Sequence, residues 1–411
     1  MGVGIEAIYA YAGQATFDVR ALFEARKLNL DRFENLSMKR KAVGLPCEDP
    51  ITHAVNAAKP IVSRLGEAEK ERIELVISAS ESGIDFGKSI ANYAHEHLGL
   101  NRSCRVFEIK QACYAGTAAL QMAASFVASG ASPGAKALVI ATDISVHQAQ
   151  TDNYAEPSMG TGAVALLVSD RPSILSLDLG ATGYHSYEVM DTCRPVVGQE
   201  LGDADLSLMS YIDCLGGAFQ SYVDRVEGAD YVKTFDYLAF HTPFAGMVRG
   251  AHRKMMRKWQ RASPDEIEED FARRVGPSLK YCVEVGNVYS ATVWLALCGV
   301  IASAPPGRRH RVGMFSYGSG CSSEFFSGVL QPDAGARFAA LGLDQALAQR
   351  YTLKLAEYER LLELNSRFGF GVRDQEVDVS SFGEIYERQL AGRGLLVLKG
   401  ISGYHREYTF S

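Results

Sequence analysis

The sequence contains no Cys-x-x-Cys pair and no His-Glu-x-x-His motif, although its 411 residues include eight cysteines and nine histidines. These absences argue against a zinc site and against a disulfide framework, so we expect no metal centre. No apolar stretch is long enough to span a bilayer, and the first residues carry no basic region followed by a long apolar run. We therefore expect neither a membrane segment nor a secretory signal.

The sequence also has fewer basic than acidic residues, with 42 lysines and arginines against 48 aspartates and glutamates and a net charge of −6. A chain that is acidic overall is not expected to bind nucleic acid. No segment is of low complexity, and 47% hydrophobic content with 22% charged residues allows a large core. This composition is typical of a cytoplasmic enzyme without a nucleic-acid or membrane partner.

What the sequence does contain is a cysteine in a setting typical of nucleophiles. Cys113 lies between a short apolar run, 106–109, that predicts a strand and a run of small residues, 116–128, that predicts a buried helix. The thiol is therefore expected on a tight turn at a helix N-terminus, where the helix dipole and unpaired N–H groups favour the thiolate. A thiolate so placed can accept an acyl group, although the alternative, a buried and inert cysteine, is common.

Other polar residues follow predicted strands or lie in turns. Glu81, His241 and the segment 318–320 each come directly after a short apolar run, and Asn287 lies in a Gly-Asn turn. Open α/β sheets bind their ligands at the carboxyl ends of their strands. We therefore expect these residues to gather around Cys113.

Seven short motifs, spread over most of the chain, carry a family resemblance. They are SESGID (80–85), KQACYAGTAAL (110–120), TDI (142–144), EPSMGTGAVA (156–165), FHTPF (240–244), VGNVYSAT (285–292) and SYGSG (316–320). Together, and in this order, they resemble 3-hydroxy-3-methylglutaryl-CoA synthase, a family of the thiolase superfamily. The chain is most similar to the polyketide β-branching subgroup, which acts on acyl groups tethered to carrier proteins; the segments that favour this subgroup are 28–50, 110–116 and 392–408.

The resemblance implies an α/β fold, namely the thiolase-like five-layered αβαβα fold made of two similar halves. We expect an N-terminal half over 1–170 and a C-terminal half over 171–411. The candidate site residues divide between them: Glu81 and Cys113 in the first, and His241, Asn287 and Ser319 in the second. Alternating strand-like and helical runs agree with parallel sheets covered by helices; the strand-like runs are 75–77, 137–141, 163–168, 237–240, 312–315 and 395–398. Thiolase relatives generally pair, so a homodimer is also implied.

Residue chemistry and the resemblance together suggest catalytic roles. Cys113 would carry an acetyl group as a thioester, and Glu81 would remove a methyl proton from it. Burial in an apolar pocket raises the pKa of a carboxyl group, which makes it a better base. His241 and Asn287 would hydrogen-bond the acceptor ketone as it becomes an alkoxide. The alternatives are a solvated loop carboxylate, a structural histidine and a turn asparagine.

The segment 316–320 is a further candidate for substrate binding. Because glycine has no Cβ, the loop from Gly318 to Gly320 would allow backbone N–H groups to approach an oxyanion. We expect Tyr317, Ser319 and Gly320 to bind substrate, with Ser319 as a positioning group rather than a second nucleophile. Another motif, DTCRP (191–195), resembles a family motif near the mouth of the active site, and the sequence assigns it no role.

The implied reaction is an aldol-type condensation by a C-acyltransferase. An acetyl group from an acetyl-carrier protein, held on Cys113, would join the β-ketone of a carrier-bound polyketide intermediate, and hydrolysis of the thioester would follow. No tightly bound cofactor is expected, because the phosphopantetheine of the carrier proteins is the substrate tether. Three alternatives stay open: the mevalonate-pathway synthase that uses free coenzyme A thioesters, a decarboxylating ketosynthase in which Glu81 has no role, and a non-catalytic module that docks carrier proteins.

A basic stripe is expected on a helix over 247–261. Arginines recur there every four residues, which places them on one face; the basic residues are Arg249, Arg253, Lys254, Arg257, Lys258 and Arg261. Carrier proteins are acidic, so Arg249, Arg253, Lys254 and Arg257 are candidates for a docking rim beside the pocket. The alternative is a solvated face whose charges pair with the acidic run 265–270.

Overall fold

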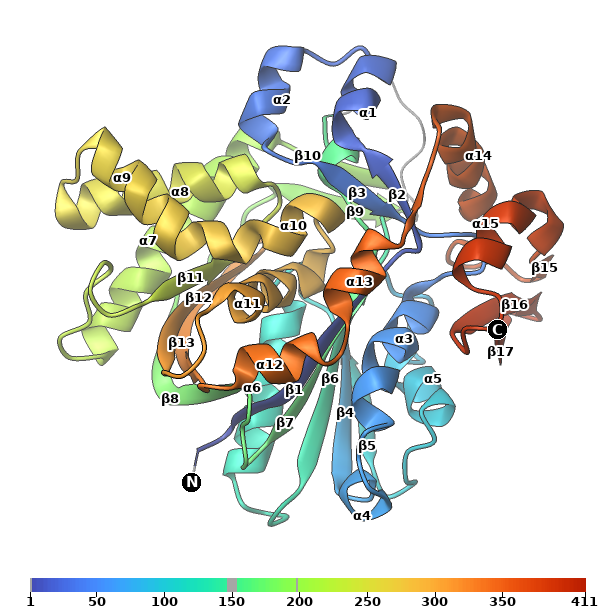
Figure 1. The fold of residues 1–411 in the computed structure, drawn as a ribbon, viewed down its shortest axis with the longest axis horizontal. Coiled ribbons are helices and arrows are strands. Elements are labelled where there is room, and N and C mark those ends of the chain that lie inside the picture. Colours follow the sequence, from blue (N-terminus) through green and yellow to red (C-terminus); the bar gives the residue numbers. More distant parts are fainter. Residues whose placement is uncertain (1, 146–153, 197–198) are drawn as a thin grey trace.

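A computed structural model describes residues 2–145, 154–196 and 199–411, and a nine-stranded mixed sheet forms its centre (Figure 1). From one edge to the other the strands are β11 (Tyr237–Phe240), β12 (His310–Gly318), β13 (Ser322–Leu330), β8 (Leu175–Tyr184), β1 (Gly4–Ala12), β7 (Gly162–Ser169), β6 (Lys136–Asp143), β4 (Ile73–Ala79) and β5 (Arg105–Ile109). The strand-like runs predicted before residue 320 all fall within these strands.

The sheet has two parts with the same topology. In the order β4-β6-β7-β1 the first pair is parallel and the next two are antiparallel, and β11-β12-β13-β8 repeats this pattern. The two parts join only through a short antiparallel contact between β1 and β8, where Gly4 faces Ser176 and Ile5 faces Leu175. The expectation of two similar halves agrees with this topology, and the division at residue 170 stays a prediction.

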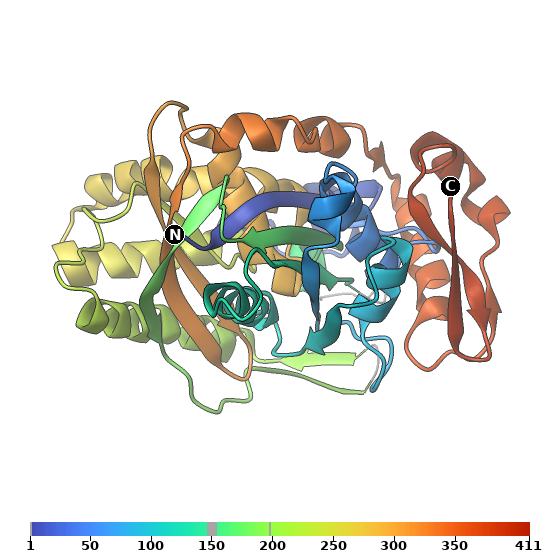
Figure 2. The same cartoon turned by 90° about the horizontal axis from the view of Figure 1, so that it is seen from below.

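Helices cover both parts of the sheet and give the five layers expected. The outer layers contain α3 (Pro50–Val62), which packs on β1, β6 and β7, and α7 (Ala204–Arg225), which packs on β8 and β13 (Figure 2). The middle layer contains α6 (Ala115–Ala128) and α11 (Thr292–Ser303). Helix α6 packs on β4 and β6, while its Gln121 donates to Glu324 of β13. Helix α11 is apolar all round, as a helix enclosed on every side must be.

The N-termini of the two middle helices meet at the centre of the molecule. A Cβ atom on Gly116, in the first turn of α6, would lie 2.3 Å from the carbonyl oxygen of Ser290 and 2.7 Å from Nε1 of Trp294. Only glycine allows this approach. The contact brings the turn that carries Cys113 against the segment that carries Asn287.

Two sequence expectations about the sheets were wrong. The sheet is mixed rather than parallel, because alternating runs reveal strands and helices but not the direction of pairing. The run 395–398 does not belong to the second half of the large sheet. It lies mostly in β16 (Leu396–Ser402), the middle strand of a small antiparallel sheet with β15 (Gln375–Glu376) and β17 (His405–Phe410).

The remaining elements surround this framework. The other strands are β2 (Ala15–Asp18), β3 (Arg40–Val43) and β14 (Tyr351–Thr352), which pair together, and the hairpin of β9 (Thr192–Val196) and β10 (Gln199–Gly202). The other helices are α1 (Val19–Ala25), α2 (Leu30–Leu36), α4 (Glu67–Lys70), α5 (Ile90–His97), α8 (Ala245–Gln260), α9 (Pro264–Asp270), α10 (Leu279–Val285), α12 (Ala334–Ala339), α13 (Leu343–Ala348), α14 (Leu355–Asn365) and α15 (Gly383–Gln389). Within the described ranges, no helix has the length and apolar character needed to cross a bilayer.

Candidate active site

Cys113 occupies the tight turn that the sequence predicts between β5 and α6. The turn is closed by the Tyr114 N–H, which donates to Gln111 O at 3.1 Å, and Ala112 has a φ of 43°. A left-handed conformation is costly for a residue with a Cβ, and such strain is typical of functional turns. Cys113 itself is only 8% exposed. The turn therefore holds the thiol at the N-terminus of a buried helix.

Cys113 and Glu81 form a close pair. The Cys113 thiol donates a hydrogen bond to Glu81 Oε1 at 3.2 Å, and Glu81 lies directly after β4 as predicted. Burial raises the pKa of Glu81 to about 7; the nearby Arg194 opposes this rise, and the charge of Asp143 adds to it. The pair thus places a base of near-neutral pKa beside the sulfur.

The expectation that the helix N-terminus favours the thiolate was wrong. Burial raises the pKa of the Cys113 thiol well above its ordinary value, and the negative charge of Glu81 raises it further. The partial positive charge of a helix N-terminus is smaller than the combined effect of lost solvation and a carboxylate at hydrogen-bond distance. The resting cysteine is therefore a thiol, and its proton points at Glu81.

Asp143, at the end of β6, joins the loop of Glu81 to the second half of the protein. Its Oδ1 accepts from the Glu81 N–H at 2.9 Å and from the hydroxyls of Ser80 and Ser82. Its Oδ2 accepts from the N–H of Ser290 at 3.0 Å and from the Ser290 hydroxyl. This fully buried carboxylate fixes the catalytic loop from both sides.

His241 is held in place by its backbone, through hydrogen bonds of its N–H and its carbonyl group. Its N–H donates to Phe315 O, and its carbonyl accepts from the Tyr211 hydroxyl at 2.7 Å. The side chain is buried, and among the described residues Nδ1 has no hydrogen-bond partner. Burial lowers the pKa of His241 to about 3, so the imidazole is neutral at physiological pH. An unpaired buried ring nitrogen is costly unless a substrate group meets it.

Asn287 is oriented by its own turn. Its Oδ1 accepts from the Tyr289 N–H at 3.0 Å and from the Thr292 hydroxyl at 2.8 Å. Among the described residues, the partner of its Nδ2 is the sulfur of Met159 at 3.7 Å, which is a weak acceptor. The side chain therefore presents an N–H group that can donate to a substrate oxygen.

The segment 317–320 packs against the nucleophile turn, but its groups are partly occupied. A Cβ on Gly318 would lie 2.6 Å from Tyr114 N and 2.7 Å from Gln111 O, so only glycine fits there. The Tyr317 hydroxyl donates to Asp191 Oδ2 at 2.5 Å, and the Gly320 N–H donates to Asp191 Oδ1 at 2.8 Å. The Gly320 amide is therefore not a free oxyanion donor. Substrate binding by Tyr317, Ser319 and Gly320 stays a prediction.

Arg194, in the β9 strand, also reaches this site, although sequence reasoning gave it no role. Its Nη1 lies 3.4 Å from Glu81 Oε2, and its Nη2 lies 2.8 Å from Glu200. The only sequence signal was the motif at 191–195. Nothing in sequence spacing connects it with a loop 113 residues away.

The predicted basic stripe lies on α8, which begins four residues after His241. Arg249, Arg253, Lys254 and Arg257 are all exposed. Arg249 pairs with Glu268 of α9 at 3.6 Å. Among the described residues the other three make no ion pair, so pairing with the acidic run 265–270 accounts for only one member of the stripe. A role as docking rim stays a prediction.

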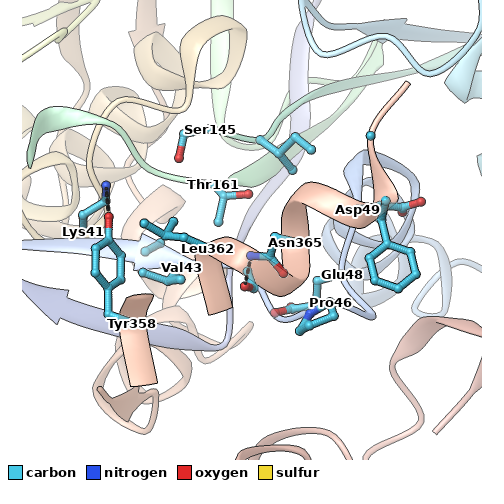
Figure 3. Close-up of a pocket in the computed structure, with 15 residues that line it drawn as sticks. Lys41, Val43, Pro46, Glu48, Asp49, Ser145, Thr161, Tyr358, Leu362 and Asn365 are labelled. Carbon is cyan, nitrogen blue, oxygen red and sulfur yellow. Dashed lines mark hydrogen bonds between the residues drawn. The ribbon is translucent and has the colours of Figure 1, made fainter. Parts of the chain in front are cut away.

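A separate cavity of about 50 Å³ lies under α14 (Figure 3). The buried Lys41 lines it and donates to Tyr358 Oη at 3.1 Å; burial lowers the pKa of this amine to about 8. None of the predicted catalytic residues lines this cavity. In the described ranges, no cluster of three or more His, Cys, Asp and Glu side chains is arranged to hold a metal ion.

Comparisons with known proteins point to one enzyme family. Family models described as hydroxymethylglutaryl-coenzyme A synthase N terminal and C terminal match residues 26–172 and 257–375. The chain is 51% identical to the polyketide biosynthesis 3-hydroxy-3-methylglutaryl-ACP synthase PksG of Bacillus subtilis, over 100% of this chain and 99% of that protein. It is 33% identical to the hydroxymethylglutaryl-CoA synthase of Enterococcus faecalis, over 88% of this chain and 91% of that protein.

Solved structures give the same result. The HMG synthase of the curacin biosynthetic pathway, in complex with acetyl donor-ACP, is 55% identical with a TM-score of 0.98, and the match covers both chains completely. MvaS in complex with 3-hydroxy-3-methylglutaryl coenzyme A is 30% identical with a TM-score of 0.85, over 100% of this chain and 99% of that one. The fold is the thiolase-like one that the resemblance implied. The chain belongs to the hydroxymethylglutaryl-CoA synthase family.

Proposed function

We propose that this protein is a 3-hydroxy-3-methylglutaryl-ACP synthase of polyketide β-branching. The observation that carries the proposal is the Cys113 thiol at 3.2 Å from a largely buried carboxylate of near-neutral pKa. Identity above 50% to PksG and to the curacin enzyme, against 33% to the Enterococcus faecalis enzyme, favours carrier-bound over free coenzyme A substrates.

The first step is transfer of an acetyl group to Cys113. The sulfur attacks the carbonyl carbon of an acetyl-phosphopantetheine thioester, and the phosphopantetheine sulfur leaves. Because the resting thiol has a raised pKa, its proton must be removed during the attack. Glu81 Oε1 already accepts a hydrogen bond from that thiol, so it takes the proton and returns it to the leaving sulfur.

The second step forms the carbon–carbon bond. Glu81, ionised again, removes a proton from the acetyl methyl group, and the resulting enolate carbon attacks the β-ketone of the acceptor. The ketone oxygen becomes an alkoxide. We assign its stabilisation to the neutral ring of His241 and the Nδ2–H of Asn287, because among the described residues His241 Nδ1 has no partner and Asn287 Nδ2 has only a weak one. The protonated Glu81 then supplies a proton to the alkoxide.

The last step releases the product. Water attacks the Cys113 thioester, the carbon–sulfur bond breaks, and the product leaves as a 3-hydroxy-3-carboxymethyl acyl group on its carrier protein. Every step uses side chains of this chain and the phosphopantetheine tether of the substrates. The proposed reaction requires no tightly bound cofactor.

Three wider properties form part of the proposal. The two halves divide near residue 170, between β7 and β8. The protein acts in the cytoplasm, as its composition suggests. It works as a homodimer, and it docks acidic carrier proteins beside the catalytic residues through the exposed face of α8.

A comparison of donors and acceptors tests the proposal. The protein is supplied with acetyl-carrier protein or acetyl-CoA, and then with an acetoacetyl group on a carrier protein or on CoA. We expect rapid acetylation of Cys113 and condensation with carrier-bound substrates, and neither reaction in Cys113→Ser. Equally efficient turnover of acetoacetyl-CoA would assign the protein to the mevalonate reaction instead.

A further inference from the structure

Arg194 contacts the proposed base on the side away from the nucleophile. Glu81 Oε1 accepts a hydrogen bond from the Cys113 thiol, while Oε2 lies 3.4 Å from Arg194 Nη1. The same nitrogen donates to the backbone carbonyl of Glu81 at 2.9 Å. The Arg194 guanidinium therefore contacts both the side chain and the main chain of Glu81.

Arg194 is held in place independently of Glu81. Its guanidinium bonds to Glu200 on the neighbouring strand β10 at 2.8 Å, and it lies over the ring of Tyr289 at 4.6 Å. The hairpin begins at Asp191, which is fixed by the Tyr317 hydroxyl and the Gly320 N–H. The cation is thus pre-positioned by the second half of the chain, over a loop that belongs to the first.

We propose that Arg194 is a positioning residue that holds Glu81 ionised and turned toward Cys113. The inference rests on the proposed function, in which Glu81 is the base. A guanidinium stays protonated at all physiological pH values, so it supplies a constant charge to the carboxylate. By occupying Oε2, it leaves Oε1 as the oxygen that takes protons from the substrate side.

The charges around Glu81 explain why this cation matters. Among the residues that the structure describes, the ionisable groups that face the carboxyl group are Arg194, Cys113, Asp143, Glu200 and Tyr289. Arg194 is the cation among them. Burial raises the pKa of Glu81, Asp143 and Glu200 raise it further, and Arg194 lowers it. Without Arg194 the pKa of Glu81 would rise above about 7, and less of it would be ionised at neutral pH.

The pH dependence of condensation tests the inference. In wild type we expect the rate to fall on the acid side as Glu81 is protonated. An opposite charge at this distance is typically worth about 1–3 pH units, so Arg194→Gln should move that acid limb upward by at least about one unit. Arg194→Lys, which keeps the charge, should leave the acid limb close to its wild-type position. Arg337→Gln, which removes a surface charge on α12, should leave the limb unchanged.

The outcomes separate this inference from the proposed function. If wild type neither acetylates Cys113 nor condenses, the proposed function fails. If wild type is active and Arg194→Gln has an unmoved acid limb with only a raised KM, Arg194 binds substrate and the inference fails. Should Arg194→Gln unfold, as judged by circular dichroism, Arg194→Lys decides: an acid limb that moves upward by less than about one unit supports the inference, and an acid limb that does not move overturns it.

Discussion

At the scale of single residues, burial sets the chemistry of this site. Glu81 and Cys113 both have raised pKa values because they are withdrawn from water, and His241 is kept neutral for the same reason. The consequence is a resting state in which the thiol is protonated and the carboxylate can accept its proton. In the proposed reaction, Glu81 is the base first for acyl transfer and then for enolate formation.

Ionisation of Glu81 away from water should lower the free energy of unfolding at high pH. Because the folded-state pKa of Glu81 is about 7 against an ordinary 4.5, the folded protein holds a proton that the unfolded chain releases between these values. This contribution to stability is complete below pH 4.5 and is lost as the pH rises through 7. Glu81→Gln removes it, so the variant should gain about 2–4 kcal/mol relative to wild type between pH 4.5 and 8.

Urea unfolding of both proteins at pH 4.5 and pH 8 measures this change. The quantity that matters is the difference in unfolding free energy between variant and wild type at each pH. A difference that is the same at the two pH values would contradict a raised pKa for Glu81.

At the scale of elements, the segments around Cys113 pack so closely at two glycines that a Cβ atom would not fit at either position. The end of β12 touches the nucleophile turn at Gly318, and α6 touches the Ser290 carbonyl at Gly116. Through these contacts, the second half of the chain fixes where the turn that carries Cys113 lies. The geometry of the thiol therefore depends on elements that carry no catalytic side chain.

Gly318→Ala tests this dependence. The added Cβ would meet backbone atoms at 2.6 and 2.7 Å, so either the nucleophile turn or the hairpin must move. We expect acetylation of Cys113 to slow by at least about tenfold, since a 1 Å misplacement can cost far more. The control is Gly250→Ala in α8, where a Cβ meets nothing within 4 Å, and which should keep full activity. Equal acetylation rates in the two variants would refute the role of this contact.

The exposed face of α8 supplies a second test at this scale. Changing Arg253, Lys254 and Arg257 together to Glu reverses charges that make no ion pair in the described structure. We expect KM for the carrier-bound donor to rise by about tenfold or more and acetylation by a small pantetheine thioester to stay unchanged. Lys399→Glu, an exposed residue of β16, is the matched control. A loss with both donors would mean that the helix itself is damaged.

Sequence patterns predicted elements better than they predicted relationships between elements. The apolar runs around Glu81, Cys113 and His241 do mark strands, and the small-residue run after Cys113 marks α6. The pairing of β1 with β8, the separate sheet of β16 and the reach of Arg194 to Glu81 depend on contacts between distant segments. The direction of the pKa shift of Cys113 was missed because local sequence reveals the helix dipole but not the depth of burial.

At the scale of the whole molecule, one edge strand of the large sheet pairs with no further strand of the described chain. Strand β5 is the last strand of the sheet, it leads directly to Cys113, and Phe107 on it is 39% exposed. An exposed edge strand with an apolar side chain is a surface on which a second chain can pair. We therefore place the expected homodimer contact there.

Light scattering after size-exclusion chromatography tests this contact. We expect a dimer for wild type and a shift toward monomer for Phe107→Glu, because a charge at the centre of the edge opposes pairing. Leu179→Glu, which changes a side chain exposed on β8, serves as the control and should stay dimeric. A wild-type monomer, or a dimer untouched by Phe107→Glu, would rule out the β5 edge as the interface.

The proposed reaction depends on two groups that act in sequence: Cys113, which carries the acetyl group, and Glu81, which turns it into a nucleophile. Intact-protein mass measurement of wild type and Glu81→Gln follows both steps directly, first with acetyl-carrier protein and then after addition of acetoacetyl-carrier protein. We predict that both proteins become acetylated on Cys113, the variant more slowly, and that only wild type loses the acetyl group to condensed product. Discharge of the acetyl group into product by Glu81→Gln at the wild-type rate, or no acetyl adduct in wild type, would contradict the account.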